Sequence, residues 1–111
     1  MVRKAKVDYD KENDILWIYF GEPVKDSLEI DKFVIEFSHD DKIIGVEIFD
    51  ASKTISKLTL KKISKQMLMN IKQVTLRSFQ SKELIYVIIG ILFEREKLSM
   101  QIPAPITVRT S

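Results

Sequence analysis

Two segments with alternating apolar side chains decide the fold: Phe33-Val34-Ile35-Glu36-Phe37 and Ile44-Gly45-Val46-Glu47-Ile48. Successive side chains of a strand point to opposite faces, so each segment has one apolar face, with polar or small residues on the other. The polar sequence Ser-His-Asp-Asp-Lys at 38–42 connects them. Two alternating segments with a short polar connection predict an antiparallel β-hairpin.

Further strands are predicted on both sides of this hairpin. Residues 15–20 and 84–93 are apolar on both faces, which is typical of central strands. Residues 74–79 and 98–102 add two more strands, and Pro103-Ala104-Pro105 ends the last one. The polar residues at 94–97 predict a hairpin tip between the last two strands.

A change of period after residue 58 predicts a helix. Leu60, Ile63, Met67 and Ile71 recur at steps of three and four, which places them on one stripe of a helix. Thr59 is a candidate N-cap. The predicted fold class is therefore α+β: an antiparallel β-meander sheet with one amphipathic helix at about residues 59–71 packed on one face.

The composition is typical of one globular domain spanning residues 1–111. Apolar residues make up 45% of the chain, and there are only three Gly and three Pro, which excludes fibrous, low-complexity and disordered proteins. Because Cys is absent, disulfides, zinc–cysteine sites and thiol catalysis are excluded. The glycines at 21, 45 and 90 are too far apart for a Gly-rich phosphate loop, and we expect no cofactor.

The sequence predicts a cytoplasmic protein. Residues 1–6 are basic but lead into Asp8-Tyr9-Asp10, not into the apolar segment of a signal peptide. The longest apolar run, at 84–93, is about half as long as the roughly twenty residues of a membrane helix. High Lys, Ile and Glu contents without Cys are typical of a thermophilic source, and an AT-rich genome produces the same bias.

Charge is unevenly distributed along the chain. Residues 1–52 hold 7 basic and 13 acidic residues, a net charge of −6, whereas residues 53–111 hold 11 basic and 3 acidic residues, a net charge of +8. The overall charge of +2 therefore conceals an acidic half and a basic half. The basic half either complements the acidic half or binds an external partner.

An acidic cluster at residues 8–14 consists of Asp8, Asp10, Glu12 and Asp14. The first three match the spacing of calcium-loop ligands, but Asn13 stands where that loop needs Gly and Tyr19 where it needs a bidentate Glu. We interpret the cluster as a polar turn whose aspartates fix the backbone. An enzymatic or metal site at this cluster is the alternative.

Few residues are available for acid–base or nucleophilic catalysis. His39 is the only histidine, and its place between Ser38 and Asp40 is typical of a solvated hairpin tip; adjacency in sequence is not triad geometry. Glu36 and Glu47, on the two arms of the hairpin, are a candidate carboxylate pair. We expect these two side chains to face outward with lysines nearby, and we predict that the protein is not an enzyme.

Residues 53–82 form a lysine-rich stretch without an acidic residue. Cations on one helix face can neutralise phosphates, which favours a nucleic-acid interface, although Phe79 is the only aromatic residue in the stretch. A solvated face that complements the acidic half is the alternative. The candidate nucleic-acid or partner surface consists of Lys57, Lys61, Lys62, Lys65, Lys72 and Arg77.

A pattern in the first half resembles a known family. It begins with Tyr9-Asp10-x-x-x-Asp14-x-Leu16-x-Ile18, continues with a predicted turn at Ser27-Leu28-Glu29 that leads into the first hairpin segment, and closes with Ile44-Gly45-x-Glu47-Ile48-x-x-Ala51-Ser52. This pattern, over about residues 7–53, is similar to the small prokaryotic family catalogued as domain of unknown function 2283. That family usually has Gly at the hairpin tip, where this chain has Asp41-Lys42.

The motif also has a structural interpretation. Gly45 allows a large side chain such as Trp17 to approach closely across the sheet. Asp50 or Ser52 is expected to cap the chain as it leaves the strand. Both roles specify the fold rather than a site.

The resemblance implies a compact β-meander ending in a helix, and it supplies no catalytic residues. Some family members resemble antitoxins encoded beside a small toxin, which implies a protein-binding role. Residues 54–111 lie outside the resemblance and add the helix and further strands. We therefore hypothesise a non-catalytic protein-interaction module, antitoxin-like or self-associating, with nucleic-acid binding as the alternative. Two strands that are apolar on both faces favour a homo-oligomer, most simply a dimer.

Overall fold

The computed structural model describes residues 3–105 and shows an eight-stranded antiparallel sheet with two short helices. The predicted α+β class is confirmed. The elements are β1 (Arg3–Asp10), β2 (Ile15–Tyr19), β3 (Asp26–Ile30), β4 (Phe33–Phe37), β5 (Ile43–Ile48), α1 (Ala51–Thr59), α2 (Lys65–Met69), β6 (Gln73–Gln80), β7 (Leu84–Leu92) and β8 (Lys97–Pro105).

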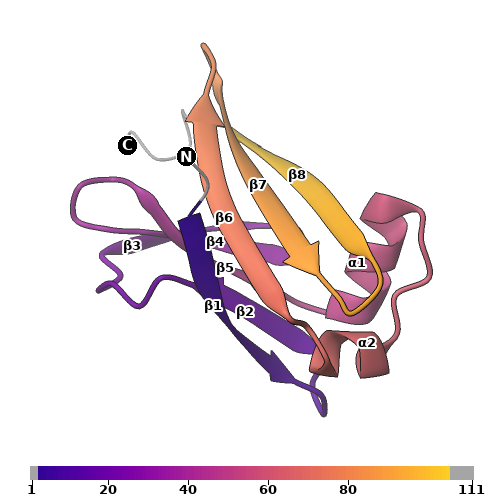
Figure 1. The fold of residues 1–111 in the computed structure, drawn as a ribbon. Helices are drawn as coiled ribbons and strands as arrows, with labels where there is room; N and C mark the ends of the chain where they lie inside the picture. The colour runs from indigo at the N-terminus through magenta and orange to yellow at the C-terminus, as the bar shows by residue number, and fades with distance from the viewer. Residues whose placement is uncertain (1–2, 106–111) are drawn as a thin grey trace.

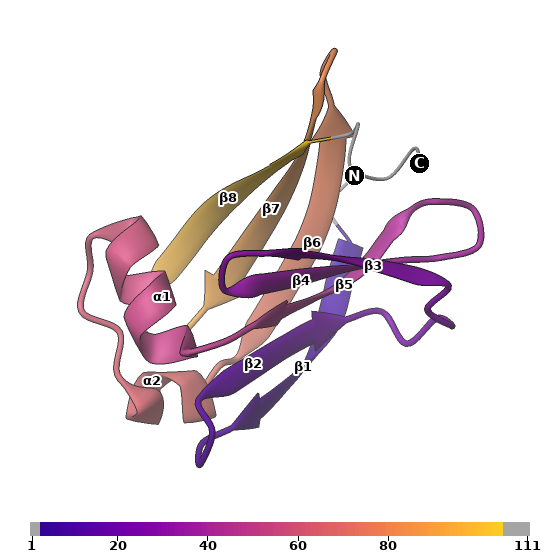
Figure 2. The same ribbon diagram turned by 180° about the vertical axis from the view of Figure 1, so that it is seen from behind.

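The spatial order of the strands is β3-β4-β5-β2-β1-β6-β7-β8. The sheet curls into a half-barrel, and both helices lie at one end of it, with α1 in contact with β8 (Figures 1 and 2). Strand β1 joins two half-sheets, because its residues 6–10 pair with β2 and its residues 3–5 pair with β6. Within residues 3–105, no helix is long and apolar enough to cross a membrane.

The inner face of the curled sheet carries the hydrophobic core. Alternate residues of every central strand point inward and are buried, and Ile55 of α1 and Leu68 of α2 cover them. Burial of this apolar surface supplies the main driving force for folding. The most completely buried strand residues are Leu16, Ile18, Ile35, Val46, Ile48, Val74, Leu76, Val87, Ile89 and Ile91.

The predicted hairpin is present as β4 and β5, with a register shift between Glu36 and Phe37. The Ser38 hydroxyl oxygen accepts hydrogen bonds from the backbone N–H groups of Asp40 and Lys42, at 3.3 and 3.2 Å. Asp41 has φ 59°, the left-handed conformation that favours Gly. The chain therefore forms a tight tip with an aspartate at the left-handed position.

The helical region differs from the prediction of one helix at 59–71. Helix α1 ends at Thr59, because Leu60 takes a left-handed conformation (φ 57°) and leaves its side chain 91% exposed. The Ser56 hydroxyl then accepts a hydrogen bond from the Ile63 N–H at 2.8 Å, and Ser64 caps α2. The apolar stripe thus continues across a break that periodicity does not reveal, and Thr59 is the last residue of α1, not a cap.

The polar turn predicted at 8–14 is also shorter than expected. Residues up to Asp10 belong to β1, and only residues 11–14 form the turn. Ala5, Val7 and Tyr9 face the core, although charged residues stand between them on the outer face. These charged residues conceal the alternation expected of a half-buried strand.

Asp14 ties this first turn to the start of α1. Its carboxylate accepts hydrogen bonds from the Tyr9 hydroxyl (2.6 Å), the Ser52 hydroxyl (2.7 Å) and the Ser52 N–H (3.1 and 3.2 Å). Its carbonyl accepts the Ala51 N–H at 2.8 Å. The predicted cap by Asp50 or Ser52 is wrong, because Asp50 makes no side-chain cap and the Ser52 hydroxyl donates to Asp14. Asp14 caps α1 from 38 positions away.

The electrostatics of Asp14 follow from this network. Burial leaves Asp14 only 7% exposed and opposes its ionisation, but the hydrogen bonds from Tyr9 and Ser52 and the charge of Lys65 lower its pKa below 3.8. Burial and the hydrogen bond to Asp14 raise the pKa of Tyr9. Asp14 is therefore a charged acceptor at neutral pH, with a neutral phenol as its donor.

We predict that Asp14→Ala lowers the free energy of unfolding at pH 7 by about 2–4 kcal/mol, because buried donors lose a charged acceptor. Asp14→Asn tolerates the φ of 54° and should cost less. Because the pKa of Asp14 is lower in the folded protein, its carboxylate stabilises the fold fully above the unfolded-state pKa. This stabilisation is lost as pH falls through the folded-state pKa. The difference between wild type and Asp14→Asn should therefore shrink below about pH 4 in urea unfolding.

Asp31→Asn is the matched control, because Asp31 also has a positive φ (51°) but is exposed. Its effect should stay within about 0.5 kcal/mol at every pH. Equal stability of Asp14→Asn and wild type at pH 7 would contradict the capping role of Asp14.

Candidate functional site

The outer face of β2, β4 and β5 combines aromatic and acidic side chains. The inward residues of these strands fill the core, so alternation places Trp17, Tyr19, Glu36 and Glu47 on the outer side. We call these four residues the acidic-aromatic face. Regular sheet strands position all four side chains, so their spacing is fixed by the backbone register.

A chain of contacts links this face across several strands. The Trp17 and Tyr19 rings are stacked, with 3.9 Å between centroids and 20° between planes. The Tyr19 hydroxyl donates to Asp8 on β1 at 2.8 Å, and the Trp17 indole N–H donates to Glu36 on β4 at 2.8 Å. The aromatic pair is therefore held between the carboxylates of Asp8 and Glu36.

Gly45 makes room for one of these carboxylates. It lies opposite Glu36 in the β4–β5 register, and a Cβ atom added to Gly45 would overlap the Glu36 carboxylate oxygen that accepts from Trp17. The prediction that Gly45 accommodates Trp17 itself is therefore corrected. The glycine accommodates Glu36, which in turn orients the indole.

The two glutamates of the hairpin face outward, as predicted, but without lysine partners. Glu36 is 9% exposed and Glu47 is partly buried. Burial and the negative charge of Glu36 raise the pKa of Glu47. Among residues 3–105 the ion pairs are Arg3–Glu22 and Lys32–Asp50, so no cation compensates this carboxylate pair.

The carboxylates of the 8–14 cluster point in different directions. Asp8 binds Tyr19 on the outer face, and Asp14 turns inward toward Tyr9. Asp10 accepts hydrogen bonds from the side chain and backbone of Asn13, at 2.8 and 3.1 Å, and these bonds lower its pKa. In the part of the chain that the structure describes, no group of three His, Cys, Asp or Glu residues could hold a metal ion.

The six residues of the predicted lysine-rich surface are all exposed, but they come from different parts of the fold. Lys57, Lys61, Lys62, Lys65 and Lys72 belong to α1, α2 and their connections at the helical end of the molecule (Figure 1). Arg77 instead points outward from the middle of β6. The role of these six residues in binding remains a prediction. His39 is exposed at the tip between β4 and β5.

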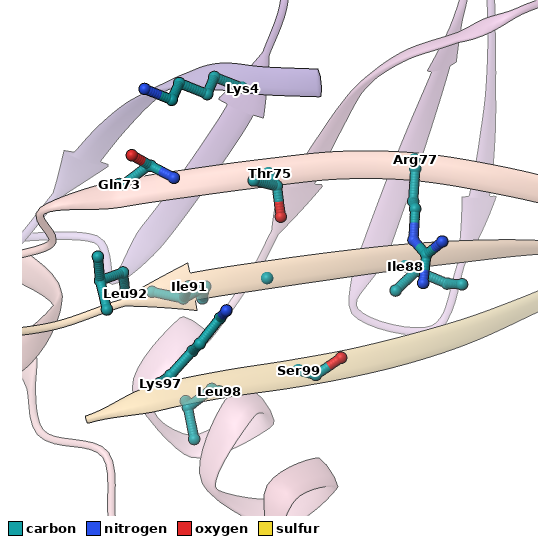
Figure 3. Close-up of a pocket in the computed structure, with 11 residues that line it drawn as sticks. Lys4, Gln73, Thr75, Arg77, Ile88, Ile91, Leu92, Lys97, Leu98 and Ser99 are labelled. Atoms are coloured by element: carbon teal, nitrogen blue, oxygen red, sulfur yellow. The ribbon is translucent and has the colours of Figure 1, made fainter. Parts of the chain in front are cut away.

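A groove of about 610 Å³ crosses the outer face of the other half-sheet (Figure 3). We call it the basic groove, and its outer-face lining is Lys4, Gln73, Thr75, Arg77, Ile88, Gly90, Leu92, Lys97 and Ser99. Sequence reasoning missed it because its residues come from β1, β6, β7 and β8. The available signal was the absence of Asp and Glu from β6, β7 and β8.

Two relatives match parts of the chain. An uncharacterized protein of Methanocaldococcus jannaschii is 43% identical over 51 residues, 45% of this chain and 44% of that protein. A protein of Methanosarcina mazei named "putative hypoxanthine phosphoribosyltransferase" is 33% identical over 80 residues, 71% of this chain and 60% of that protein. The chain spans less than two thirds of either relative, and no enzymatic activity is established for it by these matches. No solved structure matches significantly.

A family model described as Protein of unknown function (DUF2283) matches residues 6–52. This segment contains β2 to β5, most of β1 and the first residues of α1. It therefore includes the Asp14 network and the whole acidic-aromatic face. The resemblance predicted for residues 7–53 is confirmed: residues 6–52 of this chain match the model of DUF2283, a family whose function is unknown.

Proposed function

We propose that the chain is a non-catalytic protein-interaction module whose acidic-aromatic face binds an arginine-bearing segment of a partner protein. The observation that carries the proposal is the 2.8 Å hydrogen bond from Trp17 to Glu36. This bond holds the indole ring beside the carboxylates of Glu36 and Glu47, which have no cationic partner among residues 3–105.

Uncompensated negative charge on a partly buried surface favours a cationic ligand. Glu36 is nearly buried and Glu47 is partly buried, so both carboxylates have lost part of their hydration. The raised pKa of Glu47 is the direct sign of this cost. A cation beside the pair would relieve the repulsion, and Glu47, as the more exposed of the two, would contact it.

Arginine suits this face better than lysine. Its planar guanidinium stacks on aromatic rings and donates two parallel hydrogen bonds to a carboxylate. The stacked pair of Trp17 and Tyr19 offers the ring, and Glu47 offers the carboxylate. Because strands hold these groups, little conformational freedom is lost on binding.

All four residues of the face lie inside the DUF2283 segment, so we assign the interaction to that segment. In an antitoxin-like role, the acidic-aromatic face would bind an arginine of a basic toxin. Self-association would be the same chemistry with the basic half of a second copy, because residues 53–111 carry a net charge of +8. The experiments below separate these occupants.

We predict that a short synthetic peptide of alternating arginine and glycine changes the fluorescence of Trp17, the only tryptophan, in a saturable way. The double variant Glu36→Gln/Glu47→Gln should weaken this binding at least about tenfold, since each charge-assisted bond contributes about 1.5–3 kcal/mol. The glutamine at position 36 can still accept from Trp17, so the change removes charge while it keeps the geometry.

Glu83→Gln/Glu94→Gln is the matched control, because it removes the same charge from exposed positions of the other half-sheet. Equal weakening by the two double variants would show a general charge effect and would overturn the proposal. Sedimentation velocity in low and high salt identifies the occupant. A dimer that is lost in high salt and in Glu36→Gln/Glu47→Gln would show that a second copy fills the face.

Gly45→Ala should displace Glu36 from Trp17 without unfolding the protein. The added methyl group overlaps the end of a flexible side chain, which can rotate away. We expect an unfolding free energy within about 1 kcal/mol of wild type, a shifted Trp17 emission and several-fold weaker peptide binding. Unchanged emission and affinity would show that the Trp17–Glu36 bond does not organise the site.

Glu47→Gln should raise the melting temperature at pH 7. The pKa of Glu47 is higher in the folded protein than its ordinary 4.5. The protonated side chain therefore stabilises the fold fully below the unfolded-state pKa, and this stabilisation is lost as pH rises through the folded-state pKa. The uncharged glutamine avoids this loss. The gain should disappear below about pH 4.5, and thermal melts at both pH values test it. A lower melting temperature at pH 7 would show that Glu47 stabilises the fold.

A further inference from the structure

The outer face of β6, β7 and β8 has a chemistry opposite to that of the acidic-aromatic face. These three strands contain no Asp or Glu. Their outward residues include hydroxyl, amide, aliphatic, aromatic and cationic side chains. The outward residues nearest the helical end line the basic groove. This surface shares no residue with the acidic-aromatic face, so the inference below does not depend on the proposed function.

A row of small side chains forms the floor of the groove. The register places Lys4 beside Thr75, Thr75 beside Gly90, and Gly90 beside Ser99, in a line that crosses four strands. A Cβ atom on Gly90 would lie 2.5 Å from the Thr75 hydroxyl oxygen, so the missing side chain is what keeps the floor open. Ile88 and Leu92 stand on either side of Gly90 along β7 and form the walls.

Three cations surround this floor. Lys4 lies at the β1 end of the row, Arg77 reaches across β7 beside Ile88, and Lys97 approaches β7 from β8 (Figure 3). All three side chains are exposed, and none belongs to an ion pair among residues 3–105. Exposed cations around hydroxyl and amide groups are typical of surfaces that bind phosphate groups.

An exposed aromatic pair continues the same face toward the β6–β7 tip. Phe79 and Tyr86 are opposite each other in the register, and their rings are stacked with 4.8 Å between centroids. Phe79 is 50% exposed. The pair lies four residues along β6 from Thr75, roughly 13 Å away. Base rings stack on aromatic side chains of this kind in proteins that bind single strands.

We propose that this face binds single-stranded nucleic acid, with phosphates over the basic groove and a base stacked on Phe79. The distance from the groove to the aromatic pair suits an extended oligonucleotide rather than one small anion. A duplex keeps its bases inside and offers Phe79 no ring face to stack on. Of the predicted lysine-rich surface, this site uses Arg77 alone.

The test is the fluorescence anisotropy of a labelled oligothymidine of about twelve nucleotides, a length that spans one such surface. We expect dissociation constants in the micromolar range at low salt, and a slope of log K against log salt near −2 for three phosphate contacts. Arg77→Gln and Lys97→Gln should each reduce the slope by about 0.7. Phe79→Ala should weaken binding about tenfold and leave the slope unchanged.

The matched control is Lys57→Gln/Lys61→Gln, which removes two exposed cations from the helical end. Loss of binding in this control with no effect of Arg77→Gln and Lys97→Gln would overturn the proposal and favour a helical interface. Absence of binding at low salt would overturn it as well. Equal affinity for duplex or for inorganic polyphosphate, with Phe79→Ala unaffected, would show a polyanion surface without base stacking. Trp17 emission should not respond to the oligonucleotide, which keeps this test separate from the peptide experiment.

Discussion

The carboxylate of Asp14 is the interaction on which the arrangement of the first half depends. Through one buried side chain it joins three parts of the chain: Tyr9 on β1, the turn before β2, and Ser52 at the start of α1. A helix of nine residues is too short to be stable alone, so its position comes from its cap and its packing. The spacing of Tyr9, Asp14 and Ser52 is thereby explained by one buried acceptor and its donors, and the outer surface of the same strands takes no part in this network.

The charge asymmetry of the sequence becomes a spatial asymmetry in the fold. The acidic half builds β1 to β5, whereas the basic half builds β6, β7 and β8. Both parts bury their apolar side chains on one common inner face. Two surfaces of opposite chemistry therefore stand side by side on the outside of one sheet. A single chain in this way carries an acidic-aromatic surface and a basic surface at the same time.

The strands were predictable where one apolar face alternates with a polar one, as in the hairpin around Ser38, and where both faces are apolar, as in β7. Prediction failed where charges stand between the inward residues, as in β1, and where an apolar period continues across a break, as at Leu60. It was also wrong at Ser27-Leu28-Glu29, which belongs to β3 and is not a turn, and at Pro103-Ala104-Pro105, which continues β8 and does not end it. The sites were harder to predict than the strands. Trp17, Glu36 and Gly45 meet only because of cross-strand register, and register follows from long-range pairing that no local pattern contains.

The divided pairing of β1 has a mechanical consequence. No residue of this strand is paired on both sides, because its first part serves β6 and its second part serves β2. The hydrogen-bond ladder is therefore interrupted between the two half-sheets. Inward side chains of β2, β5 and β6 pack against one another across this interruption. A volume change in that packing would rotate one outer surface relative to the other while every side chain on both surfaces kept its local neighbours.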